Sequence, residues 1–169
     1  PLLIEQGHVL MKAEPNPEPV ELQSLARQTF RFGEFVPVPP VGPGELLVAR
    51  FDVRPNLAGR LRSFLYKAPL MFMTLQGRGI EEPESRRFIP GMAASPFLFS
   101  PAIEDNRDLA YLYTRREGKR VTGFFIYCND PGYFHEELAV EFFTAPRPRA
   151  DAGLDIDELL TFTRFPIAN

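Results

Sequence analysis

The stretch LLVARFDVR at residues 46–54 carries the clearest structural pattern in this chain of 169 residues. Apolar and charged residues alternate along it, so that an extended segment has one apolar side and one charged side. The apolar side holds Leu47, Ala49, Phe51 and Val53, and the charged side holds Arg50, Asp52 and Arg54. A period of two with one charged face predicts a half-buried β-strand.

Short apolar segments recur along the chain and are separated by glycine, proline, asparagine and aspartate. We expect further strands at residues 29–36, 70–76, 85–89, 96–100, 121–129 and 138–144. The segments 70–76 and 121–129 are apolar on both faces, as central strands are. Many short strands bounded by turn residues predict a mostly β fold, a β-sandwich or jelly-roll-like domain, with a partly open barrel as the alternative.

Two or three short helices are expected beside the strands. The side chain of Asn56 can cap a helix over residues 57–67, because its oxygen can accept a backbone N–H of the first turn. The apolar residues that share one face of this helix are Leu57, Leu61, Phe64 and Leu65. Asp105 can cap a second helix that reaches residue 113, although this segment also fits a strand. The sequence DIDE at 155–158 has capping-box spacing and predicts a third, which ends near residue 163.

The prolines divide the chain into three parts. Seven of the 18 prolines lie between Pro15 and Pro43. We therefore expect a proline-rich N-terminal segment over residues 1–44 that packs on the domain or leads into it. The β-sandwich core is expected over residues 45–150, and a short C-terminal helix and tail over residues 151–169.

Composition and charge exclude several classes of protein. The net charge is −3, whereas nucleic-acid binders carry a strongly basic surface. No apolar run is long enough to span a bilayer. The single cysteine, Cys128, excludes an internal disulfide and a thiolate zinc cage, and the two histidines lack metal-ligand spacing. Phosphate-binding glycine loops are absent as well, so we predict no metal, no nucleotide and no other cofactor.

No group of residues in the sequence predicts a catalytic centre. The serines lack the GxSxG elbow of a nucleophile, and Cys128 lies in an apolar strand where a thiol packs as a small hydrophobe. Glu141 and Asp105 are carboxylates that a glycan hydrolase could use, but such an enzyme needs two of them at a defined separation. The sequence does not pair them, and we favour a non-catalytic role.

A local excess of cations is the strongest chemical feature of the sequence. Residues 50–67 hold five cations and one acid in a chain that is acidic overall. Arginine suits bidentate contacts to carboxylate or phosphate. The candidate ligand-binding residues are therefore Arg50, Arg54, Arg60 and Arg62, with Tyr66 stacking beside them. The ligand would be an acidic glycan, a lipid phosphate or an anionic membrane surface. The alternative is a solvated face whose arginines pair with acids elsewhere in the chain.

Several phrases between residues 45 and 128 also resemble a known kind of domain. They are VARFDVRPNLAGRLRSFLYKAP at 48–69, RFIPGMA at 87–93, FLFSP at 97–101 and DNRDL at 105–109. This block resembles the soluble β-rich domain of bacterial polytopic, glycosyltransferase-like membrane proteins. The resemblance implies an extracytoplasmic, periplasmic location as part of a membrane-anchored protein. It also implies a partner, the membrane-embedded part of the same parent protein, but it supplies no catalytic residues.

These observations support one principal hypothesis and two alternatives. The principal hypothesis is a non-catalytic extracytoplasmic β-sandwich module that binds a glycan or an anionic, lipid-linked saccharide. One alternative is a structural docking domain with no small ligand. The other, less favoured, is a carboxylate-dependent glycan hydrolase.

Overall fold

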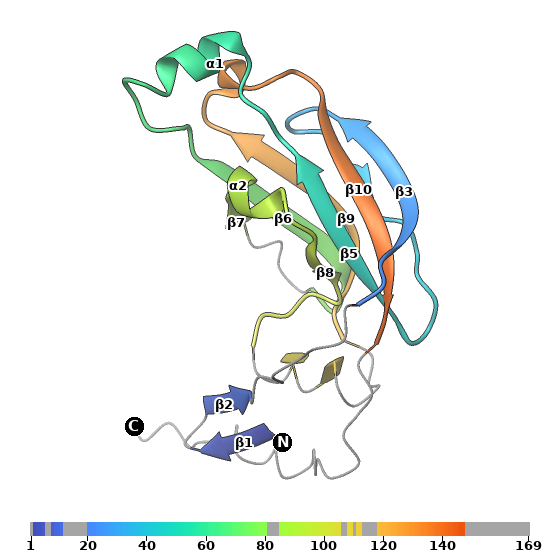
Figure 1. Cartoon of the computed structure of the whole chain (residues 1–169). Helices are drawn as coiled ribbons and strands as arrows, with labels where there is room; N and C mark the ends of the chain where they lie inside the picture. The colour runs from blue at the N-terminus through green and yellow to red at the C-terminus, as the bar shows by residue number, and fades with distance from the viewer. Residues whose placement is uncertain are drawn as a thin grey trace.

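The chain folds into two antiparallel four-stranded sheets that pack face to face, as Figure 1 shows. This computed structural model describes residues 2–5, 8–11, 20–80, 85–105, 108–109, 111–112 and 118–147. The first sheet has the order β3 (Gln23–Phe30), β10 (Leu138–Pro146), β5 (Glu45–Asp52), β8 (Phe97–Ser100). The second has the order β4 (Val36–Pro37), β9 (Arg120–Cys128), β6 (Met71–Arg78), β7 (Ser85–Phe88). Strands β1 (Leu2–Glu5) and β2 (His8–Met11) form a separate antiparallel pair.

The strand order confirms the predicted mostly β, jelly-roll-like sandwich. From β3 to β10, each connection crosses from one sheet to the other, except the one between β6 and β7, which are neighbours in the second sheet. Eight antiparallel strands connected in this way form the double-sheet arrangement of a jelly roll. The expected N-terminal segment, residues 1–44, contributes β3 to the first sheet and β4 to the second.

Aromatic side chains fill the space between the sheets. Leu47, Ala49 and Phe51 of β5 are fully buried there, as the alternation in residues 46–54 predicts. The Phe51 ring meets Phe124 of β9 edge-on, with the ring centres 5.4 Å apart. Other buried rings that pack in the same cluster are Phe30, Phe88, Phe99 and Phe142. Edge-to-face packing of this kind adds to the stabilisation that burial of the rings provides.

The outer face of the first sheet is apolar at one end and charged at the other. Leu46 and Val48 of β5 pack with Ala145 of β10 and with Leu112 in a second, smaller core. Helical residues 108–109 and 111–112 cover this end of the sheet. Asp105 Oδ1 accepts the Asp108 N–H at 2.8 Å, which agrees with the predicted capping role of Asp105. On the outer face of β5, only the second half of the strand is therefore exposed to solvent, at Arg50 and Asp52.

Two α-helices and one 3-10 turn complete the described part of the chain. They are α1 (Leu57–Arg62), α2 (Pro90–Ala93) and η1 (Pro131–Tyr133). Asn56 caps α1 as predicted, since its side chain accepts the Gly59 N–H at 2.9 Å. None of the described helices has the length and apolar character needed to cross a membrane.

Three sequence predictions about elements differ from the structure or lie outside it. The helix predicted over residues 57–67 ends at Arg62, because the chain turns at 63–65 after the Ser63 cap. The strand predicted at 29–36 is wrong. Strand β3 ends at Phe30 and a turn follows, in which Gly33 adopts a φ of 78°. The helix predicted at 155–163 lies outside the described residues.

Candidate functional site

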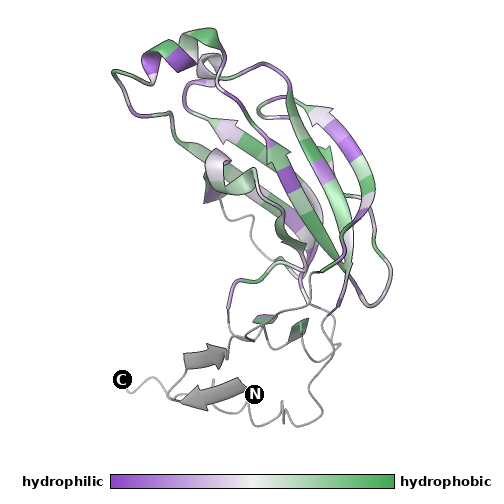
Figure 2. Cartoon of the chain, viewed as in Figure 1, coloured by the Kyte–Doolittle hydropathy of each residue, from purple (hydrophilic) through white to green (hydrophobic). Residues whose placement is uncertain are grey.

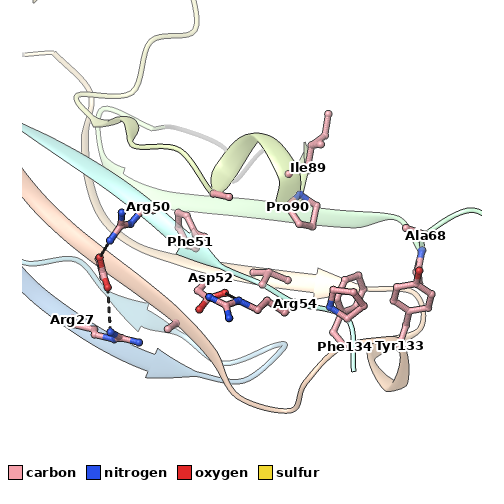
Figure 3. Close-up of a pocket in the computed structure, with 17 residues that line it drawn as sticks. Arg27, Arg50, Phe51, Asp52, Arg54, Ala68, Ile89, Pro90, Tyr133 and Phe134 are labelled. Carbon is pink, nitrogen blue, oxygen red and sulfur yellow. Dashed lines mark hydrogen bonds and ion pairs between the residues drawn. The ribbon is translucent and has the colours of Figure 1, made fainter. Parts of the chain in front are cut away.

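A pocket of about 800 Å³ opens at the edge of β5, where the first sheet lacks a strand (Figure 3). Strand β8 pairs only with Leu47, Val48 and Ala49 of β5. After Ala49, β5 has no strand partner on this side among the described residues, and α2 packs beside it instead. The end of β5, α2 and η1 therefore surround a hollow of the size that small-molecule sites have in proteins.

One wall of the pocket is a row of charged side chains that crosses three strands. Glu141 of β10 is the register partner of Arg27 on β3 and of Arg50 on β5. Its Oε1 lies 3.2 Å from Arg27 Nη1, and its Oε2 accepts a hydrogen bond from Arg50 Nη2. Figure 3 shows both guanidinium groups turned toward this carboxylate. Next to them, Arg54 Nε donates to Asp52 Oδ1 at 2.6 Å. The wall thus carries three cations and two anions that pair with one another.

The remaining lining of the pocket is mostly apolar and aromatic. Tyr133 and Phe134 line it from η1, and Ile89 and Pro90 line it at the start of α2. Tyr133 and Phe134 are almost fully buried. Asn56 holds η1 in place, because its backbone N–H donates to the Tyr133 carbonyl at 3.1 Å.

The structure separates the predicted ligand-binding residues into two groups. Arg50 and Arg54 line the pocket. Arg60, Arg62 and Tyr66 lie on α1 or just after it and do not line the pocket. Arg62 Nη1 lies 3.0 Å from Asp130 Oδ2, and the Tyr66 side chain is exposed. Three of the four predicted arginines therefore pair with carboxylates. This agrees with the alternative interpretation of the segment, a solvated face whose arginines pair with acids of the same chain.

Sequence reasoning missed several residues of the pocket. Arg27 lies in the segment that we described only as proline-rich, although its strand is visible in the alternation of QSLARQTF at 23–30. Glu141 was named from sequence only as a carboxylate that a hydrolase could use, and its two arginine partners are 91 and 114 positions away along the sequence. Helix α2, which supplies part of the apolar wall, was not predicted because it has only four residues.

Other titratable groups serve the fold rather than the pocket. Asp108, which is 4% exposed, accepts from Lys119 Nζ at 3.0 Å. Lys119 also donates to Glu104, and this hydrogen bond is the main reason why the pKa of Lys119 is raised. Burial raises the pKa of the Cys128 thiol. Within the described part of the chain, no three His, Cys, Asp or Glu side chains come together as a metal site would require.

The pocket combines directed polar groups with apolar surface. Arginines present N–H donors and the two carboxylates present acceptors, while Ile89 and Pro90 provide apolar contacts. No family model, curated protein or solved structure matches the chain. The interpretation of the pocket therefore depends on its own geometry.

Proposed function

We propose that this chain is a non-catalytic binding module that takes an acidic saccharide in the pocket at the edge of β5. The observation that supports this most directly is the row of Arg27, Glu141 and Arg50 across three strands, beside the Arg54–Asp52 pair. Three cations against two anions leave one positive charge for an acidic group of the ligand.

The chemistry of saccharides matches both the charged and the apolar lining of the pocket. Each sugar hydroxyl can donate one hydrogen bond and accept others, so a mixed set of guanidinium and carboxylate groups can satisfy several of them. The C–H faces of a pyranose ring are apolar and fit against Pro90 and Ile89, whose side chain is 44% exposed. Because the charged side chains already hold one another, little ordering of rotamers is needed when a ligand enters.

A binding role agrees better with this geometry than a hydrolytic one. Guanidinium donors engage Asp52 and both oxygens of Glu141. The two carboxylates therefore form parts of ion pairs, whereas a glycosidase uses one of its pair as nucleophile or base and the other as proton donor. Asp105, the other acid named as a candidate, accepts the Asp108 N–H and does not line the pocket.

An extracytoplasmic setting is part of the proposal. Its support is the resemblance of residues 45–128 to soluble domains of bacterial polytopic membrane proteins. In that setting the ligand would be an acidic glycan or a lipid-linked saccharide, and the membrane-embedded part of the parent protein would be a partner. A second candidate function, a structural docking domain, is favoured by the apolar side chains that α1 exposes.

The test is an amide NMR titration with a galacturonic acid oligosaccharide and with the matching neutral galactose oligosaccharide. We expect shifts at residues 50–54, 89–94 and 133–134, and tighter binding of the acidic sugar. Arg54→Gln should weaken that binding about tenfold, as expected for loss of one charge-assisted hydrogen bond. Arg120→Gln, an exposed change on β9 outside the pocket, should leave it unchanged.

Two results of the titration would contradict the proposal. One is the absence of any shift at millimolar concentrations of both sugars. The other is a set of shifts that does not include the pocket and that Arg54→Gln leaves intact. Shortened products in the acidic sample would show hydrolysis and would favour the enzyme instead.

A further inference from the structure

Helix α1 and the turn that follows it expose their large apolar side chains. The fractional exposures are 76% for Leu57, 64% for Leu61, 85% for Phe64, 79% for Leu65 and 71% for Tyr66. Single exposed apolar residues are ordinary on protein surfaces, but five within ten positions are not. Figure 2 shows hydrophobic segments interspersed with hydrophilic ones along α1, at one end of the molecule.

The opposite side of α1 is firmly attached to the domain. Gly59 is buried, and a β-carbon there would lie 2.0 Å from the Tyr133 carbonyl oxygen. At 100° per residue, Gly59 lies about 180° around the helix from the mean direction of Leu57 and Leu61. Asn56 adds hydrogen bonds from its side chain to the carbonyls of Gly132 and Phe134, both at 2.9 Å. The fold therefore holds the apolar face outward.

Positive charge surrounds this apolar face. The sequence contains no acidic residue between Asp52 and Glu81. Arg60 and Lys67 are exposed, and neither forms an ion pair within the described part of the chain. Arg62, on the side nearer the domain, pairs with Asp130. An apolar face flanked by unpaired cations is complementary to a surface that is apolar inside and anionic at its rim.

We propose that α1 and residues 63–67, here called the α1 tip, dock the domain onto an anionic lipid bilayer. Phe64 and the leucines enter the boundary between headgroups and acyl chains, and Arg60 and Lys67 contact lipid phosphates. Helices that lie in a membrane interface combine such Leu and Phe faces with Lys and Arg on the polar side. The α1 tip lies at the opposite end of the sandwich from the beginning of β3, so it can reach a flat surface (Figure 1).

The proposal goes beyond saccharide binding and uses different residues. None of the α1 tip residues named here lines the pocket. An Arg54→Gln variant should therefore bind vesicles like the wild type, whether or not it binds a saccharide. A failure of saccharide binding in the pocket can therefore be distinguished from a failure of vesicle binding at the α1 tip.

The absence of tryptophan from the chain allows a direct test. Phe64→Trp introduces one fluorophore at the α1 tip. We expect its emission to shift to the blue with vesicles of phosphatidylcholine and phosphatidylglycerol, and brominated acyl chains to quench it. Phosphatidylcholine vesicles alone should produce a much smaller effect, and added salt should weaken the binding. The matched control is Val20→Trp, an exposed position just before β3, which should show no shift.

Vesicle flotation of variants that contain no tryptophan separates the contribution of the apolar side chains from that of the cations. Leu61→Ser with Leu65→Ser should abolish flotation, and Arg60→Gln with Lys67→Gln should lower the apparent affinity at least about tenfold. Arg120→Gln should have no effect. Circular dichroism of each variant checks that the fold is retained.

Three outcomes would overturn the proposal. The first is a Phe64→Trp emission that vesicles leave unchanged. The second is a blue shift in buffer that grows with protein concentration, which would assign the α1 tip to a second copy of the chain. The third is an emission already blue-shifted in dilute buffer, which would mean that another segment of the same chain covers the tip.

Discussion

At the scale of single residues, Gly59 links α1 to the rest of the sandwich. A β-carbon at this position would lie 2.0 Å from the Tyr133 carbonyl oxygen, which is backbone and cannot move aside as a flexible side chain could. We therefore expect Gly59→Ala to lower the free energy of unfolding by about 1–3 kcal/mol, the usual cost of overpacking. Urea denaturation followed by circular dichroism measures this change.

Gly91 provides the control for that substitution. It also lies in a short helix, α2, but a β-carbon there would have no other atom within 4 Å. Gly91→Ala should be neutral or stabilising by up to about 1 kcal/mol, because alanine has the higher helix propensity. If both variants lose the same stability, close packing at Gly59 is not the reason that the position needs glycine.

Lys119 makes stability depend on pH in the alkaline range. Its pKa is raised above the ordinary value of 10.5, chiefly by its hydrogen bond to Glu104. A lysine whose pKa is higher in the folded state contributes stability that is complete below the unfolded pKa. This contribution disappears as the pH rises through the folded pKa. The difference in unfolding free energy between the wild type and Lys119→Met should therefore be constant near neutral pH and shrink above about pH 10.5.

Asp108 determines how much unfolding free energy the Lys119→Met substitution removes at neutral pH. Without the lysine, a carboxylate that is 4% exposed loses its cation, which should cost about 1–3 kcal/mol. The control is Lys67→Met, an exposed change that should alter neither the stability nor its pH dependence. A constant difference across the alkaline range would contradict the assignment of this linkage to Lys119.

At the scale of elements, Asn56 performs two tasks at the start of α1. Its side-chain oxygen caps the helix, and its Nδ2 donates to the carbonyls of Gly132 and Phe134. An ordinary cap is worth about 1 kcal/mol, and each further hydrogen bond adds a comparable amount. We expect Asn56→Ala to destabilise the fold by about 2–3 kcal/mol, measured by denaturant unfolding.

A serine at the same position separates the two tasks. Asn56→Ser keeps an oxygen that can cap the helix but has no amide group to reach the two carbonyls. It should therefore recover about 1 kcal/mol of the loss seen with Asn56→Ala. Equal stability of the serine and alanine variants would show that the cap contributes nothing here.

The elements that could be predicted from sequence are those with a local signal. The alternation in residues 46–54 and the doubly apolar runs at 70–76 and 121–129 correspond to β5, β6 and β9. The strand at 29–36 was misplaced because Phe30 and Val36 are both buried but belong to different sheets. A segment that turns between two buried residues can contain the same residue types as a continuous strand. Residue types alone therefore do not distinguish the two.

The candidate site was less predictable because its residues meet through strand register. Arg50 and Arg54 are near each other in sequence, and the charge pattern indicated both. Their neighbours Arg27 and Glu141 come from β3 and β10, and only the pairing of these strands with each other and with β5 brings them together. The sequence of one strand contains no information about which other strand becomes its neighbour.

At the scale of the whole molecule, the two proposed binding surfaces lie at the border of the core, because Phe51, Tyr133 and Phe134 of the core line the pocket. The pocket begins where β8 stops pairing with β5, and the α1 tip projects from the connection between β5 and β6. Both are therefore attached to the end of β5, where Phe51 packs against the rings of Phe88 and Phe124. A rigid sandwich of this kind can hold a pocket and a membrane contact at a constant separation.

Two phenylalanines test this division between core and surface. Phe124 is fully buried and meets the rings of Phe30, Phe51 and Phe99, whereas Phe64 is 85% exposed. Phe124→Ala should lower the free energy of unfolding by about 3–5 kcal/mol, the cost of a large cavity in a core. Phe64→Ala removes the same atoms and should change it by less than about 0.5 kcal/mol. A similar loss in both variants, measured by denaturant unfolding, would mean that Phe64 packs in solution. The α1 tip would then not be available to a membrane.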